Sequence, residues 1–196
     1  AREDSPVRRL ILNDIGPFVS AAAIEQFVSR IGSDVVLKNL ESAIAYFKDV
    51  YSASGIIDDA DWSDFITRSV NREADGSYSL HYDPAIIDEL NTISGDLNFW
   101  DVYEKIDCPV LVLRGKYSNV LSEGTAERMG QTGPKAQLIE FENCGHAPAL
   151  TDPEQLAAIS NWLSETEMVP ETQEVSVEND ETDKDENVSE IKVNID

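Results

Sequence analysis

The chain has 196 residues, with 38 acidic and 15 basic side chains and a formal net charge of −23 at pH 7. A surface this negative repels nucleic-acid phosphates and anionic lipid, which excludes both as expected partners and leaves a small neutral or cationic substrate. No apolar run reaches the roughly 18 residues of a membrane-spanning helix, and the beginning of the chain lacks a signal-peptide pattern. The two cysteines, Cys108 and Cys144, are not spaced as a redox pair, which favours reduced thiols and a cytoplasmic protein of unknown oligomeric state.

The first predicted element is a strand. Residues 8–12, RRLIL, form an apolar run of strand length, and the breaker NDIGP follows it. The apolarity is continuous rather than alternating, which is typical of strands covered on both faces, as in a parallel sheet. We assign residues 1–17 to the core of an α/β domain on this basis.

Residues 18–105 differ from both flanks and are predicted to be a mostly helical subdomain inserted between two strands. Within this range, Asp75-Gly76 is a turn signal beside the alternating Tyr78, Leu80 and Tyr82, which indicates a small hairpin. Apolar residues at helical spacing form three stripes: Ile24, Phe27, Val28 and Ile31, ending at Gly32; Leu37, Leu40, Ile44 and Phe47; and Trp62, Phe65 and Ile66.

Residues 106–163 return to the α/β pattern, with two more apolar runs at 108–115 and 136–141. Ser122 is placed to cap a helix after the first run, and Asp152 is placed to cap one after the second. This second helix has Pro153 at its first position and Gln155 where a capping box needs it. Its apolar face is predicted to consist of Leu156, Ile159 and Leu163.

The tail, residues 164–196, holds 12 acids, 2 bases and no aromatic residue. Such a segment buries too little apolar surface to offset the entropy lost on ordering, so we expect a disordered acidic tail. The alternation of Ile191, Val193 and Ile195 leaves open an interaction tail that adds a strand to a partner's sheet.

Three motifs in this order carry a family resemblance: RRLILNDIGP, then CPVLVLRGKYSNVLS, then CGHAPAL. Over about residues 5–163 the chain resembles the C-terminal half of the α/β-hydrolase family, in particular its bacterial esterase-like members. The resemblance implies an α/β fold that contains the last three strands of the hydrolase sheet, the sixth, seventh and eighth. It also implies that the helical insert is a cap over the active site.

His146 is the leading candidate for catalysis, because it lies on a turn just beyond the end of a predicted parallel strand, where α/β sheets place ligands. The alternative is that His146 is a hydrogen-bonded structural residue without a catalytic role. The resemblance implies that His146 is the catalytic base, with its acid partner upstream.

The acid partner is left open between two residues. At the family's usual acid position this chain has Asn119, which carries no charge to stabilise an imidazolium; a triad Asp→Asn change costs on the order of 10⁴ in rate. At a second acid position known in the family, it has Asp14. Asp14 is therefore our candidate acid, and the alternative is that it braces the turn before Pro17.

The nucleophile is not identified. No Gly-x-Ser-x-Gly elbow occurs in residues 1–196, and the nearest stretch, YSASGII, lies in the insert and lacks the first glycine. We therefore expect a fragment of a serine hydrolase that acts on carboxylic esters by acyl transfer and is inactive alone. The alternative is a degenerate, non-catalytic binding protein of the same fold.

The remaining candidates carry less weight. His81 is expected at the surface or packed in the cap, and Trp62, Phe99, Trp100 and Tyr103 are expected to be core residues or, alternatively, to line an acyl pocket. No zinc spacing, EF-hand loop or glycine-rich phosphate loop is present, so no cofactor or metal is predicted. The expected ligand is a small ester-like molecule.

Overall fold

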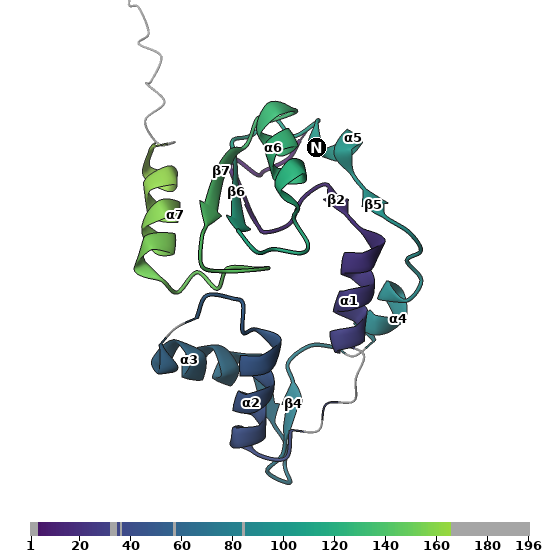
Figure 1. Ribbon diagram of the computed structural model, residues 1–196, viewed down its shortest axis with the longest axis vertical. Coiled ribbons are helices and arrows are strands. Elements are labelled where there is room, and N and C mark those ends of the chain that lie inside the picture. Colours follow the sequence, from purple (N-terminus) through teal and green to yellow (C-terminus); the bar gives the residue numbers. More distant parts are fainter. Residues whose placement is uncertain (1–3, 32–34, 36, 57, 84, 166–196) are drawn as a thin grey trace, which may run out of the picture.

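A computed structural model describes residues 4–31, 35, 37–56, 58–83 and 85–165. A parallel sheet with flanking helices forms one part, and a helical cap lies across the carboxyl ends of its strands (Figure 1). The α/β class, the parallel three-stranded sheet and the helical insertion predicted from the sequence are confirmed. Of the expected disordered tail, residues 164–196, only the first two lie within the described residues.

The sheet has the order β1-β6-β7, with β1 spanning Leu10–Asn13, β6 Val110–Gly115 and β7 Gln137–Phe141. All six residues of β6 are buried because this strand has a neighbour on each side. The other two strands are edges of the described sheet and are only partly covered. Complete burial, expected for all three strands, is therefore restricted to the central one.

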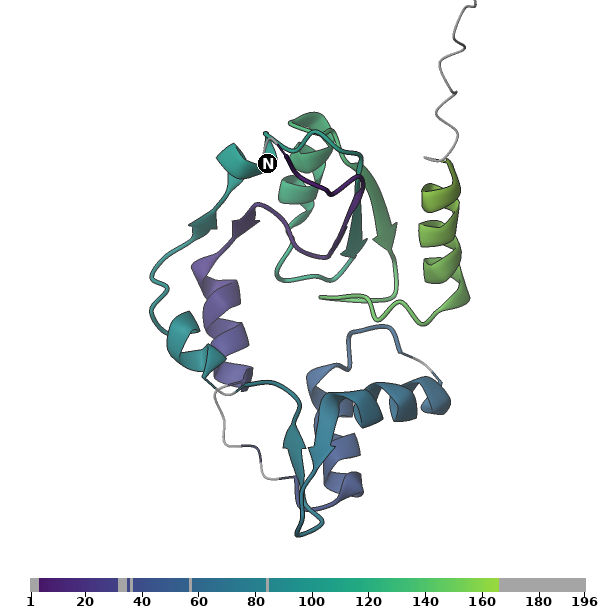
Figure 2. The same cartoon turned by 180° about the vertical axis from the view of Figure 1, so that it is seen from behind.

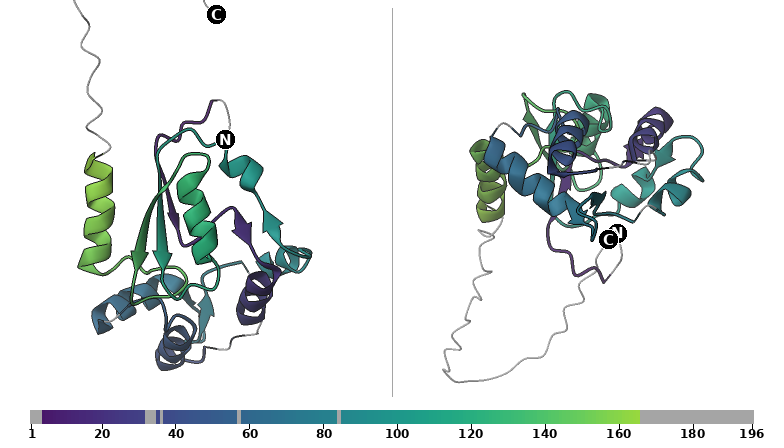
Figure 3. Two further views of the ribbon diagram at one scale, coloured as in Figure 1. Left: turned by 45° about the horizontal axis from the view of Figure 1, so that its top comes forward. Right: turned by 90° about the horizontal axis from the view of Figure 1, so that it is seen from below.

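Helices cover the two faces of β6. Alternate residues point to opposite sides, so Val110 and Val112 pack in a cluster with residues of α6, whereas Leu111 and Leu113 pack with Trp162 of α7. Figure 3 shows α6 and α7 on opposite sides of the strands. Helix α6 spans Glu123–Gln131 and α7 spans Pro153–Glu165.

Both predicted N-caps form. The side chain of Ser122 accepts a hydrogen bond from the backbone N–H of Thr125, and the carboxylate of Asp152 accepts one from Glu154 at 2.8 Å. The capping-box prediction for Gln155 is wrong, because its side chain accepts a bond from the N–H of Leu150 at 2.9 Å and is buried there.

The predicted apolar face of α7 is also only partly correct. Leu156 and Leu163 are exposed, whereas Trp162 is buried and Ile159 packs beside it. The side chain of Gln155 can be buried because it hydrogen-bonds a backbone N–H. It thus takes the inward position on α7 that the apolar pattern had assigned to Leu156.

The cap leaves and rejoins the sheet domain through a two-stranded antiparallel pair that the sequence did not predict. In this pair Phe18 is opposite Asn98 and Val19 is opposite Leu97. Its strands are β2, Phe18–Val19, and β5, Leu97–Asn98. The short helix α5, Trp100–Tyr103, follows and packs in the core cluster with α6. The predicted bounds of the cap, residues 18–105, stay a prediction.

The cap itself is mostly helical, as expected. Helices α1 and α4 lie side by side, and α2 and α3 form a second group with a hairpin (Figure 2). The hairpin turns at Asp75-Gly76, where Gly76 has a φ of 90°. The cap elements are α1 (Ala21–Ile31), α2 (Leu40–Val50), α3 (Asp59–Ser69), β3 (Val70–Arg72), β4 (Tyr78–Leu80) and α4 (Ile86–Leu90).

The second and third predicted stripes contribute to the interior of this second group, where Leu37, Phe47, Trp62 and Ile66 are buried together. Two predicted stripe residues, Phe27 in α1 and Leu40 in α2, are instead exposed. Gly32, where the first stripe was expected to end, lies outside the described residues. No helix in the described ranges has both the length and the apolar content needed to span a membrane.

Candidate active site

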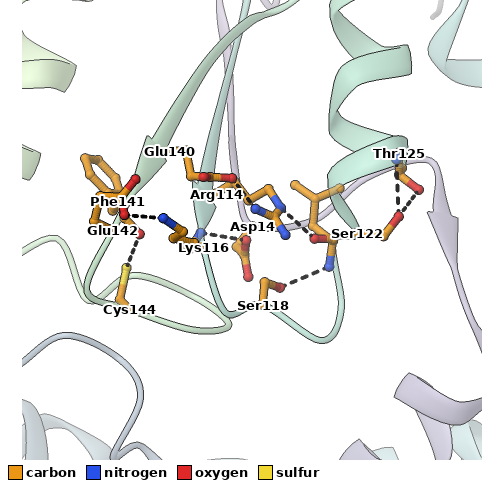
Figure 4. A network of polar contacts seen from close by, with 12 residues as sticks. Asp14, Arg114, Lys116, Ser118, Ser122, Thr125, Glu140, Phe141, Glu142 and Cys144 are labelled. Atoms are coloured by element: carbon orange, nitrogen blue, oxygen red, sulfur yellow. Dashed lines mark hydrogen bonds and ion pairs between the residues drawn. The ribbon is translucent and has the colours of Figure 1, made fainter.

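Asp14 lies directly after β1 and is fully buried. Its backbone N–H donates to the carbonyl of Leu113 at 2.7 Å, which continues the ladder between β1 and β6, and its φ of 57° then turns the chain away from the sheet. A positive φ is uncommon outside glycine, but Asp tolerates it better than most residues. The turn places the carboxylate at the carboxyl end of β6 (Figure 4).

Three hydrogen bonds satisfy this buried carboxylate. Oδ1 accepts from the N–H of Gly115 at 3.0 Å, and Oδ2 accepts from the N–H of Ala147 at 3.0 Å. Nδ1 of His146 lies 2.9 Å from Oδ2. Since an ionised carboxylate only accepts, Nδ1 carries the proton in this pair, and Nε2 of a neutral imidazole keeps a lone pair for a substrate or nucleophile.

The loop that carries His146 is held from three directions. The N–H of Gly145 donates to Ala53 of the cap at 2.6 Å, and the N–H of Tyr117 donates to the carbonyl of Cys144 at 3.1 Å. From β1, the side-chain amide of Asn13 donates to the carbonyl of Pro148 at 3.0 Å. The imidazole is thereby fixed, although its side chain keeps 37% of its surface exposed.

Gly115 permits this arrangement because two backbones meet there. A Cβ on Gly115 would stand 1.9 Å from the carbonyl oxygen of Gly145, far inside van der Waals contact. The same glycine donates its N–H to Asp14. Only glycine at the end of β6 lets the histidine loop approach this closely.

Asn119, the residue at the family's usual acid position, is turned away from the histidine. Its side-chain amide donates to the side chain of Gln26 in α1. The question left open by the sequence therefore has a geometric answer: His146 hydrogen-bonds Asp14 and not Asn119. The catalytic roles of these residues stay predictions.

Cys144 is a buried neighbour of this pair rather than a second reactive group. Burial, with a contribution from the nearby charge of Asp14, raises the pKa of its thiol to about 11. The thiol is therefore protonated at neutral pH and is a weak nucleophile. Neither cysteine is in a disulfide.

A pocket of about 700 Å³ opens beside His146 between the sheet domain and the cap. None of the four aromatic residues considered from the sequence lines it; Trp62, Trp100 and Tyr103 are buried elsewhere and Phe99 is exposed. The sheet domain contributes Tyr117, Asn119, Val120, Gly145, His146 and Ala147. The cap contributes Ala23, Gln26, Phe27, Tyr46, Phe47, Val50, Tyr51, Ala53, Ser54, Arg68, Ser69, Leu80, His81, Tyr82 and Ile86.

The stretch YSASGII, singled out in the sequence for its likeness to a nucleophile elbow, does not form one. It follows helix α2, whereas an elbow connects a strand to a helix. Ser54 of this stretch does line the pocket, and its buried hydroxyl has no hydrogen-bond partner among the described residues. Within the same residues, no three His, Cys, Asp or Glu side chains are grouped to hold a metal ion.

Comparison with known proteins finds similar hydrolases. A 3-hydroxybutyrate-oligomer hydrolase of Cupriavidus necator is 32% identical over 169 residues, which cover 82% of this chain and 58% of that protein. No protein-family profile matches the chain.

Solved structures give the same result. A putative hydrolase from Rickettsia typhi is 35% identical with a TM-score of 0.75, over 81% of this chain and 54% of that one. An α/β hydrolase from Novosphingobium aromaticivorans is 26% identical with a TM-score of 0.70, over 81% and 57% of the two chains. The chain thus spans little more than half the length of the relatives it matches.

Proposed function

Since this chain belongs to the α/β-hydrolase family and matches the C-terminal part of its fold, we propose that it supplies the base and the acid of a serine hydrolase that cleaves carboxylic esters. The observation that carries the proposal is the 2.9 Å contact between the buried Asp14 carboxylate and Nδ1 of His146 at the edge of a pocket. The hydrolase names of similar proteins support the reaction class.

In the proposed reaction, a serine hydroxyl attacks the ester carbonyl while Nε2 of His146 takes its proton. The ester C–O bond then breaks, and the imidazolium returns the proton to the leaving alcohol. Water hydrolyses the resulting acyl-enzyme in the same way. Asp14 holds the imidazole in its working tautomer and stabilises the positive charge that forms at each step.

The nucleophile and the oxyanion donors are proposed to come from polypeptide outside these 196 residues, because no elbow occurs in them. We use "complete protein" for this chain together with whatever polypeptide supplies that elbow. The chain alone is then a fragment without hydrolytic activity. The expected substrate is a small ester-like molecule that fits the pocket of about 700 Å³.

A fluorophosphonate probe tests this proposal, because it labels only an activated serine. We expect the complete protein to be labelled, and His146→Ala to lower both labelling and ester hydrolysis by at least about 10³-fold. Arg72→Gln, an exposed substitution in β3 outside the pocket, is the control and should change neither. Absence of labelling in the complete protein would overturn the proposal.

A non-catalytic protein of the same fold is the second candidate. Asn119 favours it, because this position carries no charge and its amide is committed to Gln26. In that case the complete protein binds its ligand without hydrolysing it, and His146→Ala changes binding rather than turnover. The probe separates the two candidates.

A further inference from the structure

The pocket differs in charge from the rest of the chain. The chain carries a net charge of −23, yet no Asp or Glu is among the residues that line the pocket. The ionisable side chains in the lining are Arg68, the two histidines and tyrosines. Burial raises the pKa of Tyr46, Tyr51 and Tyr82, so these phenols are neutral at physiological pH. An anion therefore meets cationic and neutral groups in this pocket, whereas the net charge alone favours neutral or cationic ligands.

Arg68 and His81 form a pair on the cap side of the pocket. Arg68 lies in the last turn of α3, and His81 follows β4. Nδ1 of His81 lies 3.1 Å from the carbonyl oxygen of Arg68, and the backbone N–H of His81 donates to Ser69 at 2.9 Å. Because a carbonyl only accepts, Nδ1 is the donor in the first of these bonds. The backbone thus holds the imidazole beside the arginine.

The guanidinium of Arg68 is available to a ligand. Its ion-pair partner is Asp64, one turn earlier in α3, at 4.0 Å, and both side chains are about four-fifths exposed. Exposed pairs of this kind contribute little to stability, so a better-oriented carboxylate replaces Asp64 at little cost. The planar guanidinium matches a carboxylate with two parallel hydrogen bonds.

The pocket joins this pair to the reacting histidine. His146 lines it from the sheet domain and Arg68 lines it from the cap, while apolar side chains such as Phe27, Phe47 and Leu80 supply other parts of the wall. A ligand with an ester at one end, an aliphatic middle and an anionic group at the other end matches this distribution.

We propose that the substrate is an ester whose acyl or alcohol part ends in a carboxylate, and that Arg68 binds this carboxylate with His81 beside it. The proposal rests on the proposed function, because it takes His146 as the reacting end. Arg68 is a substrate-binding residue in this scheme and has no part in the proton transfers.

Binding of two non-ester probes to the complete protein tests the carboxylate site without any need for hydrolysis. Adipic acid monoamide is an anion at neutral pH, and adipamide is its neutral counterpart of equal length. Isothermal titration should show that the anion binds about ten-fold more tightly than the diamide. A ratio of this size in the dissociation constants is about what one charge-assisted hydrogen bond contributes. Arg68→Gln should remove this preference, whereas Arg72→Gln, outside the pocket, should keep it.

Both arginine substitutions are at exposed positions, so unfolding curves should match those of the parent protein and exclude a folding defect. Equal affinity for the two probes, or a preference that survives Arg68→Gln, would overturn the inference.

Hydrolysis of monomethyl adipate and dimethyl adipate separates failure of this inference from failure of the proposed function. We expect a lower KM for the half-ester, with that advantage lost in Arg68→Gln and little change in kcat. Hydrolysis of both esters with equal KM overturns the inference and leaves the proposed function standing. Anion binding that depends on Arg68, without hydrolysis of either ester, overturns the proposed function and leaves the carboxylate site standing.

Discussion

The carboxylate of Asp14 and the imidazole of His146 are separated by 132 positions in the chain and by 2.9 Å in the structure. The sheet order explains this contact, because β6 lies between β1 and β7, and the loops after both edge strands meet over its carboxyl end. A buried carboxylate is costly unless it is hydrogen-bonded, and Asp14 accepts from two backbone N–H groups besides the histidine. The Asp14 carboxylate, which accepts the hydrogen bond from His146, is therefore held in place before any substrate arrives.

Gly115→Ala should disrupt this geometry. Its Cβ would stand 1.9 Å from the carbonyl oxygen of Gly145, and the obstacle is backbone rather than a movable side-chain end. We expect the free energy of unfolding to fall by about 1–3 kcal/mol and activity to fall with it, because the loop carrying His146 must shift.

Gly124→Ala is the matched control for this substitution. A Cβ at Gly124, in the first turn of α6, meets nothing within 4 Å, so alanine there should leave stability unchanged or raise it by up to about 1 kcal/mol. Denaturant unfolding of the complete protein measures both changes. Equal effects at the two glycines would show that the close approach to Gly145 does not matter.

The isolated chain should be poorly stable. Strand β1 pairs with β6 on one side, no described residue pairs with its other edge, and the flanking Val7 and Ile15 are 48% and 39% exposed. Open edges and uncovered apolar side chains favour association. We expect residues 1–196 alone to aggregate or to remain partly unfolded, and a cooperative thermal transition of a monomer in size-exclusion and calorimetric measurements would contradict this.

The pocket residue Ser54 should affect ligand binding more than stability. Its hydroxyl is buried without a described partner, so removing it breaks no described bond, and Ser54→Ala should leave stability unchanged or raise it by up to about 1 kcal/mol. If the hydroxyl binds substrate, KM should rise several-fold with kcat little changed. Ser52→Ala, outside the pocket lining, is the control. A clear loss of stability in Ser54→Ala would reveal a partner for the hydroxyl and remove the binding interpretation.

Cys144 should resist alkylation while Cys108 reacts. Cys144 is 2% exposed and its pKa is raised to about 11, mainly by burial and also by Asp14, whereas Cys108 is half-buried. The raised pKa also makes stability pH-dependent. The folded state keeps the Cys144 thiol neutral, and this contribution to the free energy of unfolding is fully present below the pKa of the unfolded state, about 8.5. It is lost as pH rises toward 11, because the unfolded chain ionises first. Mass spectrometry after iodoacetamide treatment at pH 8 should find the modification on Cys108, and comparable labelling of Cys144 would contradict its burial.

The sequence predicted those elements whose patterns are long enough to read. The three strands, the helices capped by Ser122 and Asp152 and the Asp75-Gly76 hairpin all occur. The pair β2 and β5 was missed because each strand has only two residues, too few for any periodicity.

The sequence named Asp14 as the candidate partner of His146, and the structure brings the two side chains together, but the sequence alone did not exclude Asn119. Sequence left His146 with two candidate partners, Asp14 and Asn119, because an α/β sheet brings both loops to the same edge. The choice depends on side-chain direction: the positive φ of Asp14 turns its carboxylate to the histidine, and Asn119 points to Gln26. Helical spacing likewise does not tell which aromatic side chains face a pocket that forms between two parts of the chain.

Substitution of the two candidate acids in the complete protein decides the role of Asp14. Asp14→Asn keeps the shape of the side chain but removes the charge that stabilises the imidazolium, so kcat should fall by several orders of magnitude with little change in KM. Asn119→Ala breaks a hydrogen bond to Gln26 and should change kcat far less. If Asn119 is the working partner instead, the order of the two effects reverses, and Asn119→Asp should raise activity sharply by restoring a charge at the family's usual acid position. Small and equal effects of Asp14→Asn and Asn119→Ala would remove both assignments and favour a non-catalytic protein, in which the contact between Asp14 and His146 braces the loop after β7.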